Sequence, residues 1–161
     1  MNSIAEDLER YRRGPELLAT LLTGVAGEEA DFVRAPGKWS IRQIVAHVAD
    51  TELVLATRMR FIIAEDSPAL GGFDQDAWAA NLDYARRKPG QSLETFRRLR
   101  AENFELLKEL PESGFDRVGI HSVRGPESLR KILQTYTDHA EKHARQLQEI
   151  RDEYKKVKGK K

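Results

Sequence analysis

Apolar residues recur three to four positions apart along most of the chain, which is the spacing of a helix with one buried face. No segment of useful length alternates apolar and polar residues, so the pattern predicts no strand. A brief amphipathic stretch over 74–84 predicts one short helix. The four long helical patterns cover about 3–25, 40–63, 92–110 and 126–154.

Residues suited to helix ends mark the first of these helices. Ser3 and Glu6 have the spacing of a capping box, so we expect the helix to begin after Ser3. Gly14-Pro15 interrupts the pattern. Because proline lacks a backbone N–H and disfavours helix at the residue before it, we expect a kink or a restart there.

Similar signals mark the other three helices. Ser40 and Gln43 form a second capping box, which predicts the start of the second helix. Ser92 is expected to cap the third helix, which Pro111 ends. Pro126 suits the first turn of the last helix, where its missing N–H costs nothing.

Three connections join the helices, over 26–39, 64–91 and 111–125. The second is long enough to cross the end of a bundle. Four substantial helices and one long crossover predict an all-α four-helix bundle. We expect a single domain over 1–154, followed by a basic, disordered tail over 155–161.

Two histidines lie on the apolar face of the last helix. At about 100° per residue, His139 and His143 project about 40° apart, on the same side as Ile132 and Leu147. Their Cβ atoms are then about 5–6 Å apart, and both rings can place a nitrogen about 2.0–2.1 Å from one metal ion. The alternative is a pair of core histidines whose ring nitrogens are satisfied by hydrogen bonds.

A third candidate ligand lies on the second predicted helix. His47 aligns there with Thr51 and Arg58, at the edge of the apolar face. Three histidines on facing helices, with open positions for water or substrate, fit a catalytic zinc ion, and nickel also suits imidazole. Asp50 could orient an imidazole, add a ligand or act as a base, or else be a solvated surface carboxylate.

The fourth histidine, His121, is a weaker candidate. It lies in the connection before the last helix, beside Gly119 and Ser122. We expect a surface histidine, and a position near the mouth of the metal site is the alternative.

Composition and spacing exclude several other classes of site. The chain has no cysteine, which excludes thiolate zinc sites, iron–sulfur clusters and a cysteine nucleophile. In the segment HAEKH at 139–143, the glutamate is one position too late for a zincin and points away from both histidines. The Glu-x-x-His pairs of a di-iron bundle and the Gly-x-Ser-x-Gly elbow of a serine hydrolase are also missing.

Charge and hydropathy limit the binding partners and the cellular location that we expect for the protein. The 27 basic and 26 acidic residues give a net charge of +1, which argues against a nucleic-acid binder. No stretch approaches the ~18 apolar residues that span a bilayer, and the acidic N-terminus lacks the apolar region of a signal peptide. We therefore expect a cytoplasmic protein that acts on a small molecule and binds neither membranes nor nucleic acid.

Two motifs resemble those of the DinB-like (DNA-damage-inducible) superfamily. The segment WSIRQIVAHVADTE at 39–52 is similar to the family signature kWS-x-x-e-x-x-x-H-l-x-D-x-E. Gly125 and Leu129, followed by His139-x-x-x-His143-x-x-Gln146, resemble its C-terminal motif. Order, spacing and helical context match over about residues 5–151.

The resemblance implies a four-helix bundle with up-down-down-up topology. It also implies a homodimer and one divalent metal ion, usually zinc or nickel, held here by His47, His139 and His143. The best understood relatives are thiol-dependent enzymes, such as bacillithiol S-transferases and mycothiol-dependent maleylpyruvate isomerases. Others are named as metal-dependent hydrolases, and the DNA polymerase that shares the family's name is unrelated to it.

The leading hypothesis is an enzyme whose metal binds a low-molecular-weight thiol and lowers the pKa of that thiol. The resulting thiolate would then react with a small electrophile, as in an S-transferase or an isomerase. Trp39, Thr51 and Tyr136 are candidate pocket residues, and Arg58 could meet an anionic group; each could equally be a core or surface residue. The alternatives are a hydrolase that activates water, with Asp50 as the nearest candidate base, and a metal-binding stress-response module without catalysis.

Overall fold

The structure is a computed structural model, which describes residues 1–160. Both predicted capping boxes form in it. Ser3 Oγ accepts the backbone N–H of Glu6 at 3.2 Å at the start of α1 (Ile4–Leu22). Ser40 Oγ accepts that of Gln43 at 3.3 Å, and Gln43 Oε1 accepts the N–H of Ser40 at 2.9 Å, at the start of α3 (Ile41–Ala64).

The first helix does not restart at its proline. α1 continues through Gly14-Pro15 as one element, and both residues are buried. Gly14 faces Arg100, whose Nη1 would lie only 2.3 Å from a Cβ at this position. The close approach of the Arg100 guanidinium therefore leaves no room for a side chain at position 14.

The other two long helices begin at residues different from those predicted. α5 (Pro89–Lys108) has Pro89 in its first turn, so the prediction that Ser92 caps it is wrong, and Ser92 is a buried residue inside the helix. α6 (Leu129–Gly159) is capped by Ser128, whose Oγ accepts the N–H of Lys131 at 3.1 Å. Pro126 lies outside α6 in an extended segment, so its predicted place in the first turn is also wrong.

The predicted disordered tail is largely helical in the structure. α6 continues past Tyr154 to Gly159, because residues 155–158 contain neither proline nor glycine, the two residues that disfavour a helix most. Lys161 lies outside the described residues.

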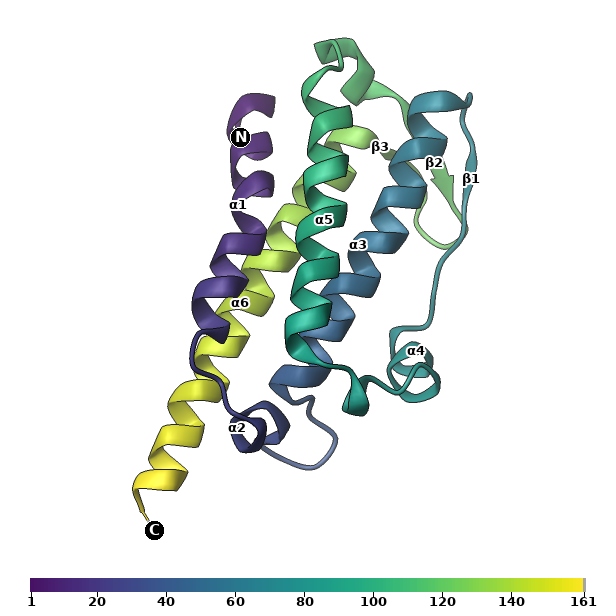
Figure 1. Cartoon of the computed structure of the whole chain (residues 1–161). Helices are drawn as coiled ribbons and strands as arrows, with labels where there is room; N and C mark the ends of the chain where they lie inside the picture. Colours follow the sequence, from purple (N-terminus) through teal and green to yellow (C-terminus); the bar gives the residue numbers. More distant parts are fainter. Residues whose placement is uncertain (161) are drawn as a thin grey trace.

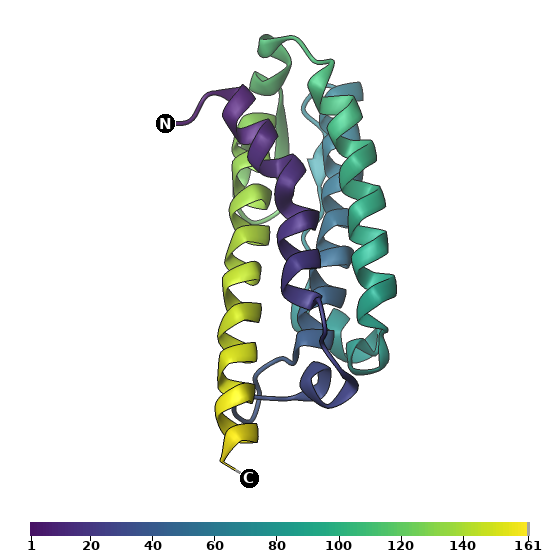
Figure 2. The ribbon, with the colours of Figure 1, turned by 60° about the vertical axis from the view of Figure 1, so that its left-hand side comes forward.

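The four long helices form a bundle with the up-down-down-up order (Figures 1 and 2). α1 and α6 run in one direction, and α3 and α5 run in the other. Near the start of α1, Arg10 Nη2 donates to Asp138 of α6 at 2.7 Å, and past the end of α1, Arg151 Nη1 of α6 donates to the carbonyl of Thr23 at 2.9 Å. α3 packs mainly on α5, and it also contacts α6.

The crossover between α3 and α5 passes along the outside of the bundle. It contains β1 (Ala69–Leu70), α4 (Gln75–Asn81) and the 3₁₀ turn η1 (Tyr84–Arg86). A second 3₁₀ turn, η2 (Glu112–Asp116), follows α5. The connection after α1 also holds a short helix that the sequence did not predict, α2 (Gly27–Asp31).

The expectation that the chain forms no strand is wrong. β2 (Val118–His121) and β3 (Gly125–Ser128) form an antiparallel hairpin, and β1 pairs with β2 in parallel. Strands of two to four residues contain too few alternations to produce a recognisable pattern. The small sheet covers the end of α3 and holds the crossover in place.

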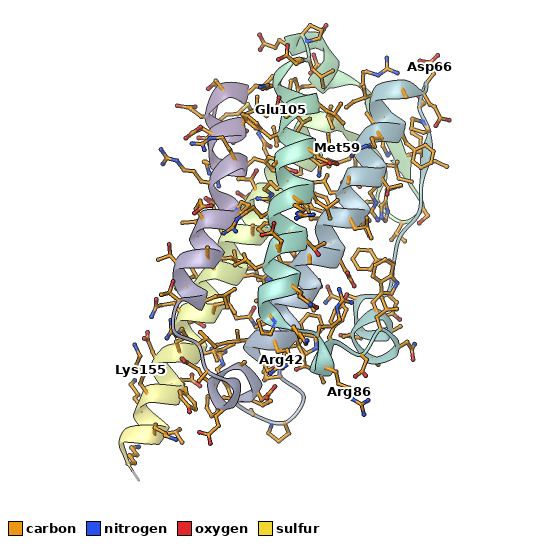
Figure 3. The ribbon with its side chains drawn as sticks, in the orientation of Figure 1. Arg42, Met59, Asp66, Arg86, Glu105 and Lys155 are labelled. Carbon is orange, nitrogen blue, oxygen red and sulfur yellow. The ribbon has the colours of Figure 1, made fainter. Side chains whose placement is uncertain are left out.

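The core consists of two main apolar clusters along the bundle axis. Met59 and Leu133 belong to one cluster, and Ile44 and Leu147 belong to the other. Figure 3 shows the side chains, among them buried Met59. The interior also contains buried polar side chains, among them His47, His121 and His143. No helix within residues 1–160 is long and apolar enough to cross a membrane.

Candidate metal centre

The structure brings three of the four histidines together inside the bundle. His47 extends from α3, and His139 and His143 extend from α6. Nε2 of His139 lies 3.0 Å from Nε2 of His47 and 3.1 Å from Nε2 of His143. The three rings therefore direct the same type of atom at one point, with His47 and His143 buried and His139 half-buried.

The opposite ring nitrogens have other partners, which fix the orientation of two rings. Nδ1 of His143 lies 2.8 Å from Oε1 of Gln146, so Nδ1 carries the proton and Nε2 keeps a free lone pair toward the centre. Nδ1 of His47 contacts Oγ1 of Thr51 at 3.5 Å. Such outer partners are the usual means of fixing the tautomer of a metal-ligating histidine.

Burial keeps these imidazoles in the neutral form that binds metals. Burial, reinforced by the charge of His143, lowers the pKa of His47 to about 4. The same causes lower the pKa of His139 to about 2, and burial also lowers that of His143. At neutral pH all three rings therefore present lone pairs.

Two of the three nitrogen–nitrogen separations are close to those around a tetrahedral metal ion. Two nitrogens each about 2.0–2.1 Å from such an ion lie about 3.4 Å apart. The two shortest separations in the cluster, at 3.0 and 3.1 Å, need only a small outward movement of the rings to reach that value. A ligand set of three neutral imidazoles suits zinc or nickel.

The pocket residues expected from the sequence lie beside the cluster. The ring centroid of Trp39 is 5.0 Å from that of His47, and the ring centroid of Tyr136 is 6.5 Å from that of His139. Thr51 contacts His47, as described above. Trp39 and His143 also line a cavity of about 240 Å³ that opens beside the cluster.

Asp50 lies near the cluster but has other partners. Its Oδ2 accepts a hydrogen bond from the Tyr84 hydroxyl at 2.7 Å, and its Oδ1 lies 3.4 Å from Nη2 of Arg87. The side chain is buried rather than solvated. Burial, followed by the hydrogen bond to Asp50, raises the pKa of Tyr84 above its usual range. Asp50 therefore ties the crossover to α3 through Tyr84 and Arg87.

Arg58 and His121 lie together at a different point from the cluster. Arg58 Nη1 donates to the hydroxyl of Tyr136 at 2.8 Å. His121 belongs to β2 and is buried, so the expectation of a surface histidine is wrong. Its burial comes from pairing in the sheet, which the sequence did not predict.

Two features of the site were not assigned a role from the sequence. Gln146 appears only as part of a motif, although its spacing of three residues from His143 on one helix could have indicated the contact. Glu52 accepts from Tyr11, from Arg100 at 2.7 Å and from Asn103 at 2.9 Å. This buried network joins α1, α3 and α5 next to the cluster, and only the tertiary structure brings its members together.

Comparison with known proteins finds relatives that carry the name of metal-dependent hydrolases. A protein from Bacillus licheniformis named "putative metal-dependent hydrolase" is 28% identical over 142 residues, covering 85% of this chain and 81% of its own. A relative of the same name from Geobacillus thermodenitrificans is 28% identical over 153 residues, covering 91% and 85%.

A solved structure has the same fold. YfiT from Bacillus subtilis, described with an unusual four-helix bundle topology, superimposes with a TM-score of 0.89 at 23% identity, covering 96% of this chain and 90% of its own. The family model of the DinB superfamily matches residues 10–147. The chain therefore belongs to the DinB superfamily.

Proposed function

We propose that the protein is a metal-dependent enzyme in which His47, His139 and His143 hold one zinc or nickel ion. The observation that carries this proposal is the convergence of three Nε2 atoms, with the outer nitrogen of His143 already engaged by Gln146. Histidines that served only the core would direct these nitrogens at separate hydrogen-bond partners.

The side chains around the cluster determine what can approach it. A bound divalent ion would act as a Lewis acid and lower the pKa of a water or thiol at its open position. The aromatic rings of Trp39 and Tyr136 lie beside His47 and His139, respectively. The cavity beside His143 provides the path by which a small substrate enters.

For the nucleophile we propose a low-molecular-weight thiol, transferred to a small electrophile or used in its isomerisation. Asp50, the expected base, is engaged by Tyr84 and Arg87. A thiol activated by a metal needs no carboxylate base, because its pKa is already near neutral. The chain has no cysteine, so the sulfur would come from the cosubstrate.

Hydrolysis is the second candidate, and two observations favour it. The relatives from Bacillus licheniformis and Geobacillus thermodenitrificans carry the name of metal-dependent hydrolases. Asp76 lines the same cavity as His143, where a carboxylate could accept a proton from water.

Metal analysis tests the centre itself. Protein purified without added metal is expected to contain close to one zinc or nickel ion per chain, and His143→Ala is expected to lose it. His121→Ala serves as the matched control, because it removes the histidine outside the cluster. Wild-type protein that contains no metal, and binds none on titration, would contradict the proposal.

Activity assays then separate the two reactions. Metal-loaded protein is incubated with an electrophile such as 1-chloro-2,4-dinitrobenzene and a panel of small thiols, and separately with p-nitrophenyl esters. Thiol-dependent turnover that His143→Ala abolishes supports the transferase. Ester hydrolysis without any thiol supports the hydrolase, and metal binding without either turnover identifies a non-catalytic module.

A further inference from the structure

Arg58 is a buried cation without an anionic partner. Arg58 is 7% exposed, and the two groups that accept its hydrogen bonds are neutral: the Tyr136 hydroxyl at 2.8 Å and the Gly71 carbonyl at 2.6 Å. Its Nε is buried and has no hydrogen-bond partner. No ion pair within residues 1–160 includes Arg58, whereas Arg100, which is also buried, pairs with Glu52 at 2.7 Å.

A buried, unpaired guanidinium is costly for a folded protein. Proteins tolerate such a charge where a ligand supplies the missing counter-ion, and a guanidinium matches the planar fork of a carboxylate. The position of Arg58 therefore suggests that the counter-ion comes from outside the chain.

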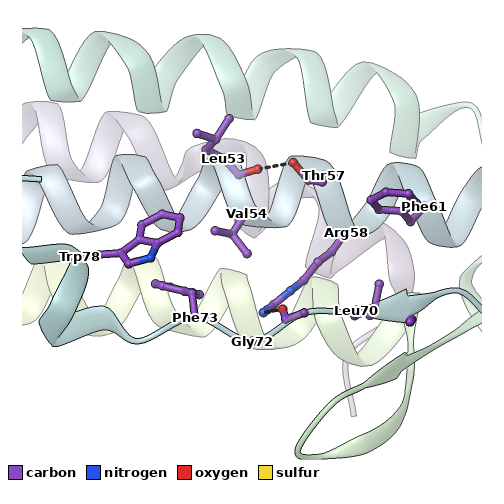
Figure 4. A pocket seen from close by; sticks show the side chains of 11 residues that line it. Leu53, Val54, Thr57, Arg58, Phe61, Leu70, Gly72, Phe73 and Trp78 are labelled. Carbon is purple, nitrogen blue, oxygen red and sulfur yellow. Dashed lines mark hydrogen bonds between the residues drawn. The ribbon is translucent and has the colours of Figure 1, made fainter. Parts of the chain in front are cut away.

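Arg58 lies in the wall between two adjoining cavities. The first, of about 350 Å³, lies between α3 and the crossover (Figure 4). Leu53 and Phe61 line it although they are 50% and 43% exposed, and Phe73 and Trp78 close it from the crossover side. Large apolar side chains at the rim of an open cavity indicate a surface that binds an apolar group.

The second cavity, of about 650 Å³, places His121 beside Arg58. Backbone N–H groups of Val123 and Arg124 donate to Nδ1 of His121 at 3.0 and 3.2 Å. Nδ1 is therefore the acceptor, and Nε2 carries the proton as a free donor. Gly72 has no side chain, and a Cβ at this position would lie 3.7 Å from Nε2 of His121. The absence of that Cβ leaves space next to this edge of the His121 ring.

The other charged groups that line the second cavity are already engaged. Arg124 pairs with Glu127 at 2.9 Å. Oδ1 of Asp74 accepts hydrogen bonds from the backbone N–H groups of Asp76 and Ala77, each at 3.0 Å, at the start of α4. Arg58 is thus the cation left for a ligand in this cavity.

This pair of cavities is connected to the histidine cluster. The hydroxyl of Tyr136 bonds to Arg58, and the ring of the same tyrosine lies 6.5 Å from His139 between centroids. Gln75 lines both the second cavity and the cavity beside His143. A molecule held by Arg58 would therefore lie one side chain away from the candidate metal.

We propose that these cavities bind an amphipathic carboxylate, with the carboxylate group on Arg58 and His121 and the apolar body between Leu53, Phe61 and Trp78. The inference deepens the proposed function, since it names the substrate class of that enzyme. Carboxylate binding itself needs no metal, which allows the two to be tested separately.

Isothermal titration of the wild-type protein with octanoate and with octan-1-ol provides the first test. The two probes share the apolar chain and differ in charge, so octanoate is expected to bind at least about tenfold more tightly, as a charged hydrogen bond allows. Equal affinity for both probes, or no octanoate binding, would overturn the proposal whether or not the variants fold.

Variants then assign the effect to Arg58. Arg58→Met keeps the length of the side chain and removes its charge, so it should lose about tenfold or more in octanoate affinity and leave octan-1-ol binding unchanged. Arg58→Lys should retain part of the preference. Arg98→Met removes an arginine whose side chain is 79% exposed on α5 and should change neither affinity. An Arg58→Met protein that binds octanoate like the wild type overturns the assignment.

Metal content of the same samples keeps the two proposals apart. His143→Ala should lose the metal and still bind octanoate, because its side chain lies outside both carboxylate-binding cavities. Metal binding without octanoate binding defeats this inference alone, and octanoate binding without metal defeats the proposed metal centre alone.

Discussion

At the scale of single residues, the hydrogen bond between Gln146 and His143 is the most specific feature of the centre. It fixes which ring nitrogen carries the proton, and it does so from the same helix turn. Gln146→Leu should weaken metal binding about 10–100-fold, because outer partners have effects of this size. Competition with a chromophoric chelator measures the affinity.

The matched variants for this prediction lie on the same helix. Gln146→Glu keeps an acceptor for the imidazole proton and should restore most of the affinity. Gln148→Leu alters an exposed glutamine that bonds to Asp152 at 2.9 Å, and should have no effect. If Gln146→Leu and Gln148→Leu bind metal equally, the role given to Gln146 is wrong.

The sequence predicts which histidines lie together, but it does not predict the hydrogen-bond partners of the residues around them. His139 and His143 follow from the spacing on one helix, and His47 follows from its place on a facing helix. The partners of Asp50 could not be predicted, because Tyr84 and Arg87 belong to a crossover whose path depends on tertiary packing. For the same reason nothing in the sequence indicated that Arg58 lacks an acidic neighbour.

At the scale of elements, the packing of α1 on α5 depends on one missing side chain. A Cβ on Gly14 would meet Nη1 of Arg100 at 2.3 Å, and that guanidinium also bonds to Glu52. Gly14→Ala should therefore destabilise the protein by about 2 kcal/mol or more, since it displaces a buried ion pair. Urea unfolding gives the change in the free energy of unfolding.

Gly90→Ala is the control for this prediction. Gly90 also lies inside a helix, α5, and a Cβ there would meet nothing within 4 Å. Since alanine favours a helix over glycine by about 1 kcal/mol, this variant should be neutral or slightly more stable. A Gly14→Ala protein as stable as Gly90→Ala would show that Arg100 moves away at no cost.

Helix starts show where local signals suffice for prediction and where they compete. The capping boxes at Ser3 and Ser40 predict their helices correctly, because two reciprocal bonds act within one turn. At the third helix, Pro89 and Ser92 are both acceptable near an N-terminus, and the helix begins at the proline. The short strands are held by their neighbours in the sheet, so no local pattern predicts them.

At the scale of the whole molecule, the histidine cluster spans two long helices. His47 lies on α3, and the other two histidines lie on α6, so an ion at the centre would cross-link them. Free metal at 100 times its dissociation constant stabilises the folded state by about 2.7 kcal/mol. For a chain of this size that should raise the melting temperature by about 5–10 °C.

Scanning calorimetry with zinc and with excess chelator checks this prediction. His143→Ala should melt at the same temperature under both conditions, because it lacks one ligand. A wild-type melting temperature that does not respond to either addition would contradict the cross-link.

The order of the helices in space is the part of the fold that the hydrophobic pattern could not supply. A long connection permits a crossover, but it does not say which neighbours run parallel. The resemblance of the two motifs to the DinB superfamily implied the up-down-down-up order, and the structure confirms it.

The crossover that contains α4 contributes cavity walls and no metal ligand. Gly72, Phe73 and Trp78 lie on it, whereas His47, His139 and His143 lie on the bundle helices. The candidate metal ligands therefore lie outside the crossover, whose residues form one wall of a cavity that Arg58 of α3 also lines. A protein engineer could exchange residues 71–78 for those of another member of the superfamily, and so reshape this wall of the cavity while the three histidines and Arg58 keep their places on the bundle helices.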